Sequence, residues 1–357
     1  MKPALAPYRL GAQRLVGEQL QSPVDVVGHL GAVQSQLHDM ALWAIARRCG
    51  ATLADIQSAF ARGDFLRTHV LRPTWHHVLP SDLGDLLEVT APRVRQLMVS
   101  GNIYLGLTPD RIERAADIAC ETVEQSDEPL TRAELDTVLT DAGYPRVDNS
   151  LGHIMIHAEL TGRVASGPVR GKQHTYMPVA LPRSRRNPDE RLAWIARLYG
   201  RGHGPVRDRD LAWWTSFTLT QSRRAIRLAE LRPVELGGET YYVDDEPPPV
   251  DVPRAMLLAN FDEFISYARD PDDFDGIGGR DWSMLMRSTG LLFVDGQLAG
   301  SWTRKLSSRT ASLDVVAARR VTAAVRAEIE AEAARFGEFV ERPIDLELRV
   351  DDSVGHK

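Results

Sequence analysis

The stretch Gly31-Ala-Val-Gln-Ser-Gln-Leu-His-Asp-Met40 decides how the first part of the chain is organised. It lies in a segment whose apolar residues recur at spacings of three and four, which predicts one amphipathic helix from Val24 to Arg48. On a regular helix, the side chains of Gln34 and Gln36 would diverge by roughly 200°. An amide beside an apolar face costs stability unless it finds hydrogen-bond partners. Two interpretations follow: a buried structural amide with an exposed one, or a functional pair.

The composition is that of a globular protein. Of the 357 residues, 43% are hydrophobic and 26% are charged, which is typical of folded domains. No apolar run approaches the length of about 18 residues that crosses a membrane, and the first ten residues lack the apolar core of a signal peptide. Cys49 and Cys120 show no metal-ligand spacing. We therefore expect a cytoplasmic protein with reduced core thiols and no membrane contact.

The net charge of -6 hides an uneven distribution of charge. The segment 183–235 holds twelve arginines against six acidic residues, whereas the segment 244–281 holds eleven acidic residues against three arginines. This separation allows one positively charged surface on a molecule whose total charge is negative. The charge is therefore compatible with a nucleic-acid partner.

One order of elements, helices followed by a hairpin, is expected three times along the chain. The first unit has the long helix described above, a helix at 52–62 and a hairpin within 65–79. Three helices and a hairpin are expected in each of the next two units: 108–125, 131–142, 149–160 and 163–178, then 188–199, 206–214, 220–229 and 234–243. A capping box from Thr131 to Glu134 supports one of these helix starts.

The last segment has a different character. We expect strands at 256–259, 291–294 and 298–302, a long helix over 312–335 and a final strand over 344–350. The chain is therefore predicted to have an α+β fold. Its domains are expected to be three tandem winged-helix units at 1–104, 105–182 and 183–246, followed by a small β-rich, barrel-like domain at 247–357.

Tandem winged helices indicate a DNA partner. The third helix of such a unit can enter a groove, and its hairpin can follow the backbone. Arg170 and Lys172 lie in a hairpin suited to phosphate contact. Winged helices also serve as protein-interaction modules, and a solvated basic loop has the same composition.

The sequence lacks the familiar catalytic and metal-binding patterns. It contains no Walker-type phosphate loop, no Gly-x-Ser-x-Gly elbow and no His-Glu-x-x-His motif. His76 and His77 are adjacent in an expected strand, so their side chains point to opposite faces and do not easily bind one ion. The pair Asp262-Glu263 is either an acid–base pair or a cap or solvated edge.

Three blocks of sequence resemble the AlkZ-type winged-helix DNA glycosylases. The blocks are Gln34-Ser35-Gln36; Leu66-Arg67-Thr68 with Arg72-Pro73-Thr74-Trp75-His76; and Phe261-Asp262-Glu263-Phe264 with Arg269-Asp270 and the hairpin 293–302. The resemblance spans Leu10 to Ile344. It implies a C-shaped molecule around DNA that removes N7-alkylated guanines, including those in interstrand crosslinks. Gln34 and Gln36 match the family's catalytic Gln-x-Gln motif.

The chemistry of that lesion fits a pair of neutral amides. An N7-alkylguanine carries a positive charge, so its glycosidic bond is weak and its leaving group needs little protonation. An amide can orient water and place its carbonyl dipole against an oxocarbenium-like sugar. We therefore expect Gln34 and Gln36 to catalyse hydrolysis with no metal, no cofactor and no covalent intermediate.

The candidate DNA-binding residues are basic or polar: Arg67, Arg72, His76, Arg170, Lys172, Arg287, Arg304 and Lys305. Alternatively, Arg67 and Arg72 form structural ion pairs with carboxylates such as Asp64. The expected partner is double-stranded DNA carrying alkylated guanine, bound by a nucleoid-associated monomer. The rival functions are a non-enzymatic winged-helix transcriptional regulator and a protein-interaction scaffold.

Overall fold

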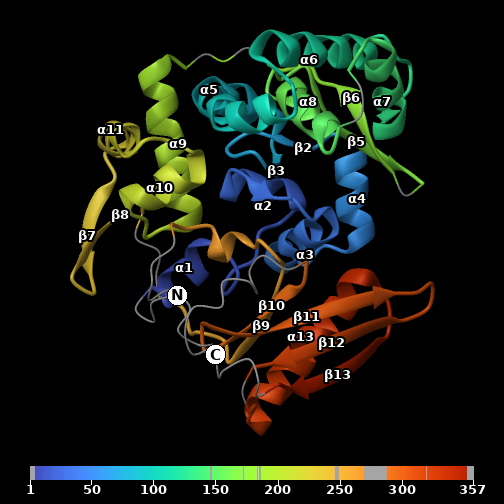
Figure 1. Cartoon of the computed structure of the whole chain (residues 1–357). Coiled ribbons are helices and arrows are strands. Elements are labelled where there is room, and N and C mark those ends of the chain that lie inside the picture. The colour runs from blue at the N-terminus through green and yellow to red at the C-terminus, as the bar shows by residue number, and fades with distance from the viewer. Residues whose placement is uncertain are drawn as a thin grey trace.

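The computed structural model describes residues 5–144, 147–171, 173–182, 184, 186–245, 249–268, 288–318 and 320–351. Within these ranges, helices and strands run from α1 (Ala6–Ala12) to β13 (Ile344–Val350), which confirms the predicted α+β class. Figure 1 shows a sheet at the bottom of the molecule and mainly helical parts above it.

Residues 23–78 form the first of three repeats. Its elements are α2 (Pro23–Leu30), β1 (Val33–Gln34), α3 (His38–Cys49), α4 (Leu53–Ala61), β2 (Leu66–His69) and β3 (Trp75–Val78). β3 pairs antiparallel with both β1 and β2, so that Gln34 and Thr68 flank His76. The first repeat therefore ends in a three-stranded sheet whose edge strand carries Gln34.

The prediction of one helix from Val24 to Arg48 is wrong. α2 ends at Leu30, and Gly31 follows with a φ of +79°, a conformation that glycine adopts without steric penalty. α3 begins only at His38. Because α2 and α3 both bury apolar residues, the helical spacing continues across the break and conceals it.

The order of helix, short strand, two helices and hairpin occurs once more in the second repeat, and the third repeat has the same order with a single bridge in place of the short strand. The second repeat, residues 109–178, contains α6 (Pro109–Glu124), β4 (Leu130–Thr131), α7 (Arg132–Asp141), α8 (Ser150–Glu159), β5 (Val164–Arg170) and β6 (Gln173–Pro178). The third repeat, residues 188–243, contains α9 (Pro188–His203), α10 (Asp208–Thr215), α11 (Leu219–Ala229), β7 (Arg232–Leu236) and β8 (Glu239–Val243). The helices and hairpins predicted for these two units are confirmed, as is the capping box from Thr131 to Glu134.

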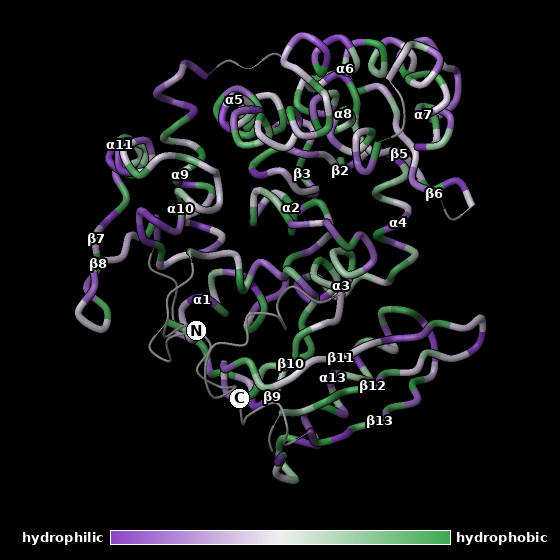
Figure 2. Tube along the Cα trace, viewed as in Figure 1, coloured by the Kyte–Doolittle hydropathy of each residue, from purple (hydrophilic) through white to green (hydrophobic). Residues whose placement is uncertain are grey.

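In each repeat, the segment between the first two helices pairs with the last strand of the hairpin. β4 pairs with β6 as β1 pairs with β3, and in the third repeat a single bridge joins Val206 to Tyr242. α5 (Pro80–Tyr104) leads from the first repeat to the second. β2 also pairs with β5, so the two repeats share one six-stranded sheet in the order β1-β3-β2-β5-β6-β4. Along α6 and α7, polar and apolar stretches alternate (Figure 2), as one-sided helices require.

The C-terminal part is one open sheet with a helix against it. Its elements are β9 (Ala255–Leu258), the 3₁₀ turn η1 (Glu263–Ile265), β10 (Gly290–Val294), β11 (Gln297–Leu306), β12 (Ala311–Ala317), α13 (Ala323–Val340) and β13 (Ile344–Val350). The strand order is β13-β12-β11-β10-β9, with only β12 and β13 parallel.

Two predictions for this part are wrong. The described strands form an open sheet with β13 and β9 at its edges, not a barrel-like closure. The segment 311–317 is a strand whose alternate residues Ala311, Leu313, Val315 and Ala317 are buried. The predicted helix over 312–335 therefore begins only at Ala323. The alanine-rich composition of 312–335 favoured a helix. Buried residues alternate along 311–317, however, and such a period of two is that of a strand.

The first repeat docks on the C-terminal sheet through α3. The buried Trp43 packs against Phe336 and Phe339 of α13, with ring centroids 5.1 and 5.3 Å away. Its indole N–H donates to the carbonyl of Leu257 in β9 over 2.9 Å. The buried Arg47 pairs with Glu332 at 2.9 Å. The repeat that carries Gln34 is therefore fixed to a rigid base.

The packing around Gly31 gives the first prediction. A Cβ atom at Gly31 would lie 2.5 Å from the side chain of Leu198, whereas a Cβ at Gly63, which has a similar φ of +77°, meets nothing within 4 Å. Gly63→Ala should cost about 1 kcal/mol of unfolding free energy because of its left-handed backbone. Gly31→Ala should cost about 1–3 kcal/mol more because it also overpacks Leu198. Urea unfolding of both variants measures the difference, and equal losses would contradict the packing at Gly31.

Candidate active site

The segment Gln34-Ser35-Gln36 leaves the edge of the first repeat's sheet and bends at Gln36. Gln34 ends β1, and the N–H of Ser35 donates to the carbonyl of Trp75 over 2.7 Å. Ser35 is fully buried, whereas Gln34 is half-buried and Gln36 is exposed. The helix on which the two amides would diverge is absent, because a strand end and a bend stand in its place.

Arg67 fixes the middle of this segment. Its Nε and Nη2 atoms donate to the carbonyl of Ser35 over 3.1 and 3.0 Å, and Nη1 lies 3.3 Å from Oγ of Ser166 in the second repeat. The guanidinium lies over the ring of Trp75 at 4.5 Å. Burial lowers the pKa of Arg67 to about 10, so the side chain remains charged at neutral pH. Arg67 thus ties the glutamine segment to the hairpin and to the second repeat.

Arg72 orients the amide of Gln34. Its Nη2 atom donates to Oε1 of Gln34 over 2.8 Å, and its guanidinium lies 4.1 Å over the ring of Trp213 in the third repeat. A guanidinium has donors only, so the oxygen of the Gln34 amide must face Arg72 and the NH2 group must face away. Gln36 is less constrained, because its Oε1 lies 2.8 Å from the hydroxyl of Thr74 and a hydroxyl can donate or accept.

Glu263 anchors the start of the segment from the C-terminal part. Its Oε1 accepts the backbone N–H of Gln34 over 2.7 Å, and its Oε2 lies 3.0 Å from Nε2 of His203 at the end of α9. Burial alone would raise the pKa of this carboxyl. The hydrogen bond and charge of His203, the charge of Arg72 and the N–H of Gln34 outweigh it and lower the pKa to about 2. Glu263 is therefore ionised, and both of its oxygens are engaged within the protein.

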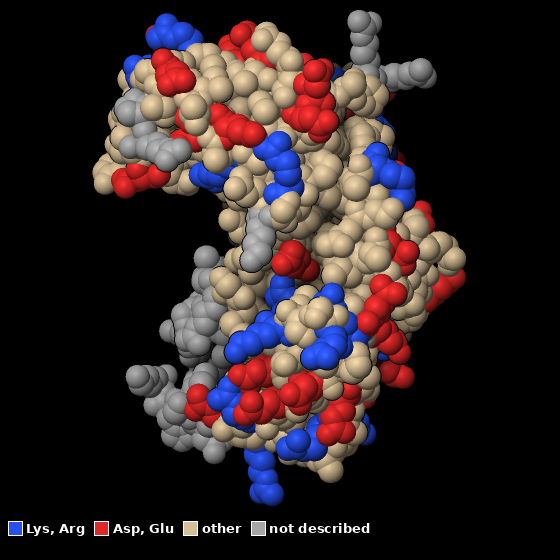
Figure 3. Space-filling model, turned by 90° about the vertical axis from the view of Figure 1, so that its right-hand side faces the viewer, with Lys and Arg blue, Asp and Glu red and all other residues tan. Residues whose placement is uncertain are grey.

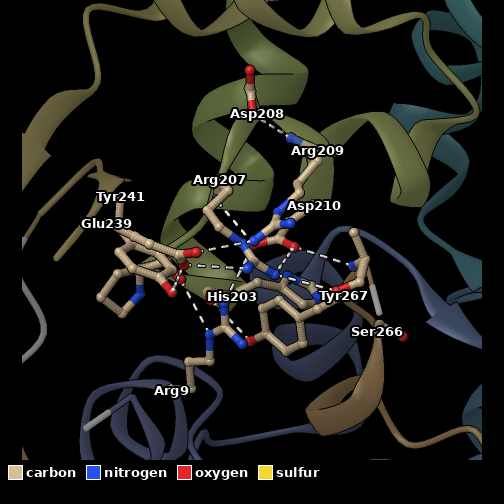
Figure 4. A network of polar contacts seen from close by, with 12 residues as sticks. Arg9, His203, Arg207, Asp208, Arg209, Asp210, Glu239, Tyr241, Ser266 and Tyr267 are labelled. Atoms are coloured by element: carbon tan, nitrogen blue, oxygen red, sulfur yellow. Dashed lines mark hydrogen bonds and ion pairs between the residues drawn. The ribbon is translucent and has the colours of Figure 1, made fainter. Parts of the chain in front are cut away.

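A polar network surrounds this anchor (Figure 4). Arg9 and Arg207 both pair with the buried Asp210, at 3.3 and 2.8 Å. Tyr267 lies under the guanidinium of Arg9 at 3.5 Å and donates its hydroxyl to the carbonyl of His203 over 2.9 Å. The network ties α1, α9 and α10 to the chain after η1. It therefore holds His203 in position against Glu263.

The neighbouring residue Asp262 has a structural role. Its side chain accepts the N–H of Phe264 over 2.9 Å and pairs with the buried Arg48 at 2.7 Å. Of the two interpretations of the pair Asp262-Glu263, the cap fits Asp262. Glu263 is instead a buried acceptor of hydrogen bonds. Asp64 pairs with Arg62 at 2.6 Å and not with Arg67 or Arg72.

The two adjacent histidines, His76 and His77, have different surroundings. His76 is buried opposite Gln34, and its Nε2 lies 3.3 Å from Nη2 of Arg72. His77 packs between the rings of Phe60 and Phe65, at 5.7 and 5.1 Å. Burial lowers the pKa of both histidines well below the usual value, and the charge of Arg72 adds to this at His76. Both rings are therefore neutral at pH 7.

The structure gathers Gln34, Gln36, Arg67, Arg72 and His76 in one place. The remaining predicted DNA-binding residues are more scattered. Arg170 pairs with Glu134 in the second repeat, Lys305 is exposed on β11, and Arg304 lies 3.7 Å from Asp39 at the start of α3. Lys172 and Arg287 lie outside the described residues.

One side of the molecule is hollowed. Figure 3 shows a recess between an upper lobe, the second repeat, and a lower lobe, the C-terminal sheet, with charged side chains of both signs around it. Across the described ranges, no group of three or more His, Cys, Asp or Glu residues is arranged to hold a metal ion. In the same ranges, no helix has the length and apolar character needed to cross a membrane.

Comparisons with known proteins identify relatives of the chain. A family model described as "DNA glycosylase AlkZ-like" matches residues 27–339. A protein of Streptomyces sahachiroi named "Interstrand DNA cross-link repair glycosylase" is 24% identical, over 83% of this chain and 85% of that protein. The solved structure of the S. sahachiroi DNA glycosylase AlkZ superposes with a TM-score of 0.76 at 20% identity, covering 97% of this chain and 99% of the other. At that identity, the structural likeness shows the fold.

The buried histidines predict instability in mild acid. Burial lowers the pKa of His38 to about 3 and holds that of His77 well below its usual value. The unfolded chain takes up protons at these residues below about pH 6.5, whereas the folded protein does not. Stability should therefore fall as the pH decreases, by about 1.4 kcal/mol per pH unit for each such proton.

His77→Phe tests this in urea unfolding between about pH 6 and pH 5, above the range in which most carboxylates titrate. An aromatic ring suits the space beside Phe60 and Phe65. Between these two pH values, the variant should lose less unfolding free energy than the wild type. The difference in slope should correspond to the uptake of about one proton. A slope identical to that of the wild type would show that His77 is not held neutral.

Proposed function

Since the chain belongs to the AlkZ-like family of DNA glycosylases, we propose that it releases N7-alkylated guanine from double-stranded DNA, including guanine in interstrand crosslinks. The observation that carries this proposal is the segment Gln34-Ser35-Gln36 at the sheet edge, whose backbone is held by Glu263 and Arg67. The name of the S. sahachiroi relative, a cross-link repair glycosylase, supports the choice of lesion.

We further propose that the three repeats are winged helices, with domain limits at 1–104, 105–182, 183–246 and 247–357. The pairing of the first short strand with the last hairpin strand in each repeat supports this. The duplex would lie in the recess of Figure 3, so that the molecule encloses it as a C-shaped monomer. Arg170, Lys172, Arg287, Arg304 and Lys305 are proposed to contact phosphates there. The protein would act in the cytoplasm, at the nucleoid.

In the proposed reaction, the oxygen of a water molecule bonds to C1′ of the deoxyribose as the C1′–N9 bond breaks. The electron pair of that bond goes to the guanine and neutralises its positive charge, and the proton of the water passes to solvent. The departing guanine therefore needs little protonation by the protein. Catalysis rests on positioning the water and on stabilising the charge that develops on the sugar.

The contact with Arg72 divides these tasks between the two amides. Because Arg72 occupies the oxygen of Gln34, the NH2 group of Gln34 is the part that can meet the DNA. Gln34 would therefore donate a hydrogen bond to an acceptor on the nucleotide. Gln36 would turn its oxygen to the water and to the developing positive charge. Arg67, Arg72 and His76 are proposed to shape this site from beneath, with any contact to the DNA made at the edge of the recess.

The first test is release of modified base from methylated duplex DNA in the presence of a chelator. The wild type should release N7-methylguanine. The double variant Gln34→Ala with Gln36→Ala should lose release while it still binds the duplex, because Gln36 is exposed and Gln34 is only half-buried, so neither is a core residue. Sequence-specific binding to undamaged DNA without any base release would point instead to a regulator.

Two isosteric variants test the division of roles. Gln34→Glu keeps an oxygen for Arg72 but removes the N–H donors, so the single-turnover release rate should fall by about tenfold or more. Gln36→Glu keeps the oxygen that faces water, and its rate should stay within about threefold of the wild type. The two variants are matched, because each adds one negative charge to the same segment. A severe loss in Gln36→Glu with an active Gln34→Glu would reverse the assignment.

A further inference from the structure

A cavity of about 570 Å³ lies beside Gln36, between the first and second repeats. Gln36, Arg67 and Trp75 line it from the first repeat. Ala133 of α7 and His174 and Tyr176 of β6 line it from the second. None of these second-repeat residues takes part in the site described above. The cavity therefore adjoins the candidate active site but is formed largely by a different repeat.

The walls of this cavity are held in place. The ring of Trp75 lies under Arg67 and next to the ring of His69, with centroids 4.3 Å apart, and its N–H points to Glu159 over 3.4 Å. Tyr176 is buried in β6 and pairs across the sheet with Ser166. Trp75 and Tyr176 thus give the cavity fixed walls at the junction of the two repeats.

The charge of the lining favours an uncharged ligand. Arg67 and Arg132 are balanced by Asp136 and Asp148. Burial lowers the pKa of His174, and the nearby Arg67 adds to this, so its ring is neutral at pH 7. A phosphate site would need an excess of positive charge. The aromatic side chains of Trp75 and Tyr176, together with the balanced charge, instead suit an organic group of the size that cavities of roughly 300–1,000 Å³ hold.

We propose that this cavity receives the uncharged aromatic part of a bulky adduct while the guanine to which it is joined lies against Gln34 and Gln36. The inference rests on the function proposed above. An adduct bonded to N7 of the guanine must lie within a few bonds of the reacting base, and the cavity that Gln36 itself lines adjoins the proposed position of that base. A methyl adduct is too short to enter, so the cavity would favour bulky lesions without affecting small ones.

Filling the cavity from either wall tests this proposal. Ala133→Trp adds bulk from α7, and Gln173→Trp adds it from β6; both residues are exposed and line the cavity. The probes are duplexes that carry N7-benzylguanine or N7-methylguanine, and the measurement is the single-turnover rate of base release. Each variant should lower the ratio of the benzyl rate to the methyl rate by at least about tenfold. Leu97→Trp, at an exposed position of α5 outside the cavity, is the control and should leave the ratio unchanged.

The possible outcomes distinguish failure of the cavity proposal from failure of the proposed function. An unchanged ratio in both cavity variants, with thermal unfolding like that of the wild type, would place the adduct elsewhere and overturn the proposal. A parallel fall of both rates would also overturn it, because the guanine itself would then occupy the cavity. If the wild type releases neither base, the proposed function fails, and this inference fails with it.

Discussion

The structure depends on one buried carboxylate. Glu263 accepts the backbone N–H of Gln34 and lies against His203, so it joins the first repeat, the third repeat and the C-terminal part at a single point. A buried charge is costly unless hydrogen bonds and opposite charges compensate it. The lowered pKa of Glu263 shows that the compensation is sufficient. The position of the segment Gln34-Ser35-Gln36 follows from this contact and from that of Arg67 with Ser35.

Much of the fold could be predicted because its signals are local. The capping box at Thr131 and the alternation in the strand 344–350 lie within a few residues of the elements that they define. The break at Gly31 could not be found in this way, because α2 and α3 continue the same apolar spacing on either side of it. The strand 311–317 was not predicted for a related reason. The alanine-rich composition of the whole segment 312–335 conceals the period of two in its first residues.

The candidate site was predictable in its members but not in its geometry. The short motif marks Gln34 and Gln36, yet Gln34 lies at the end of a strand whose partner is some forty residues away at His76. The anchor Glu263 is 229 residues from Gln34, and His203 is 60 residues from Glu263. Such contacts are set by how the repeats dock on one another, through Trp43 among others, and no local pattern encodes them.

The central claim is that the segment Gln34-Ser35-Gln36 presents both amides to one lesion. A crystal structure of the protein with a duplex that contains the abasic product and the released base tests this most directly. The account predicts that the NH2 group of Gln34 and the amide of Gln36 both lie within hydrogen-bonding distance of the same nucleotide, with Arg72 still on the oxygen of Gln34. Contacts of the two glutamines to different nucleotides, or of neither to the damaged one, would contradict it.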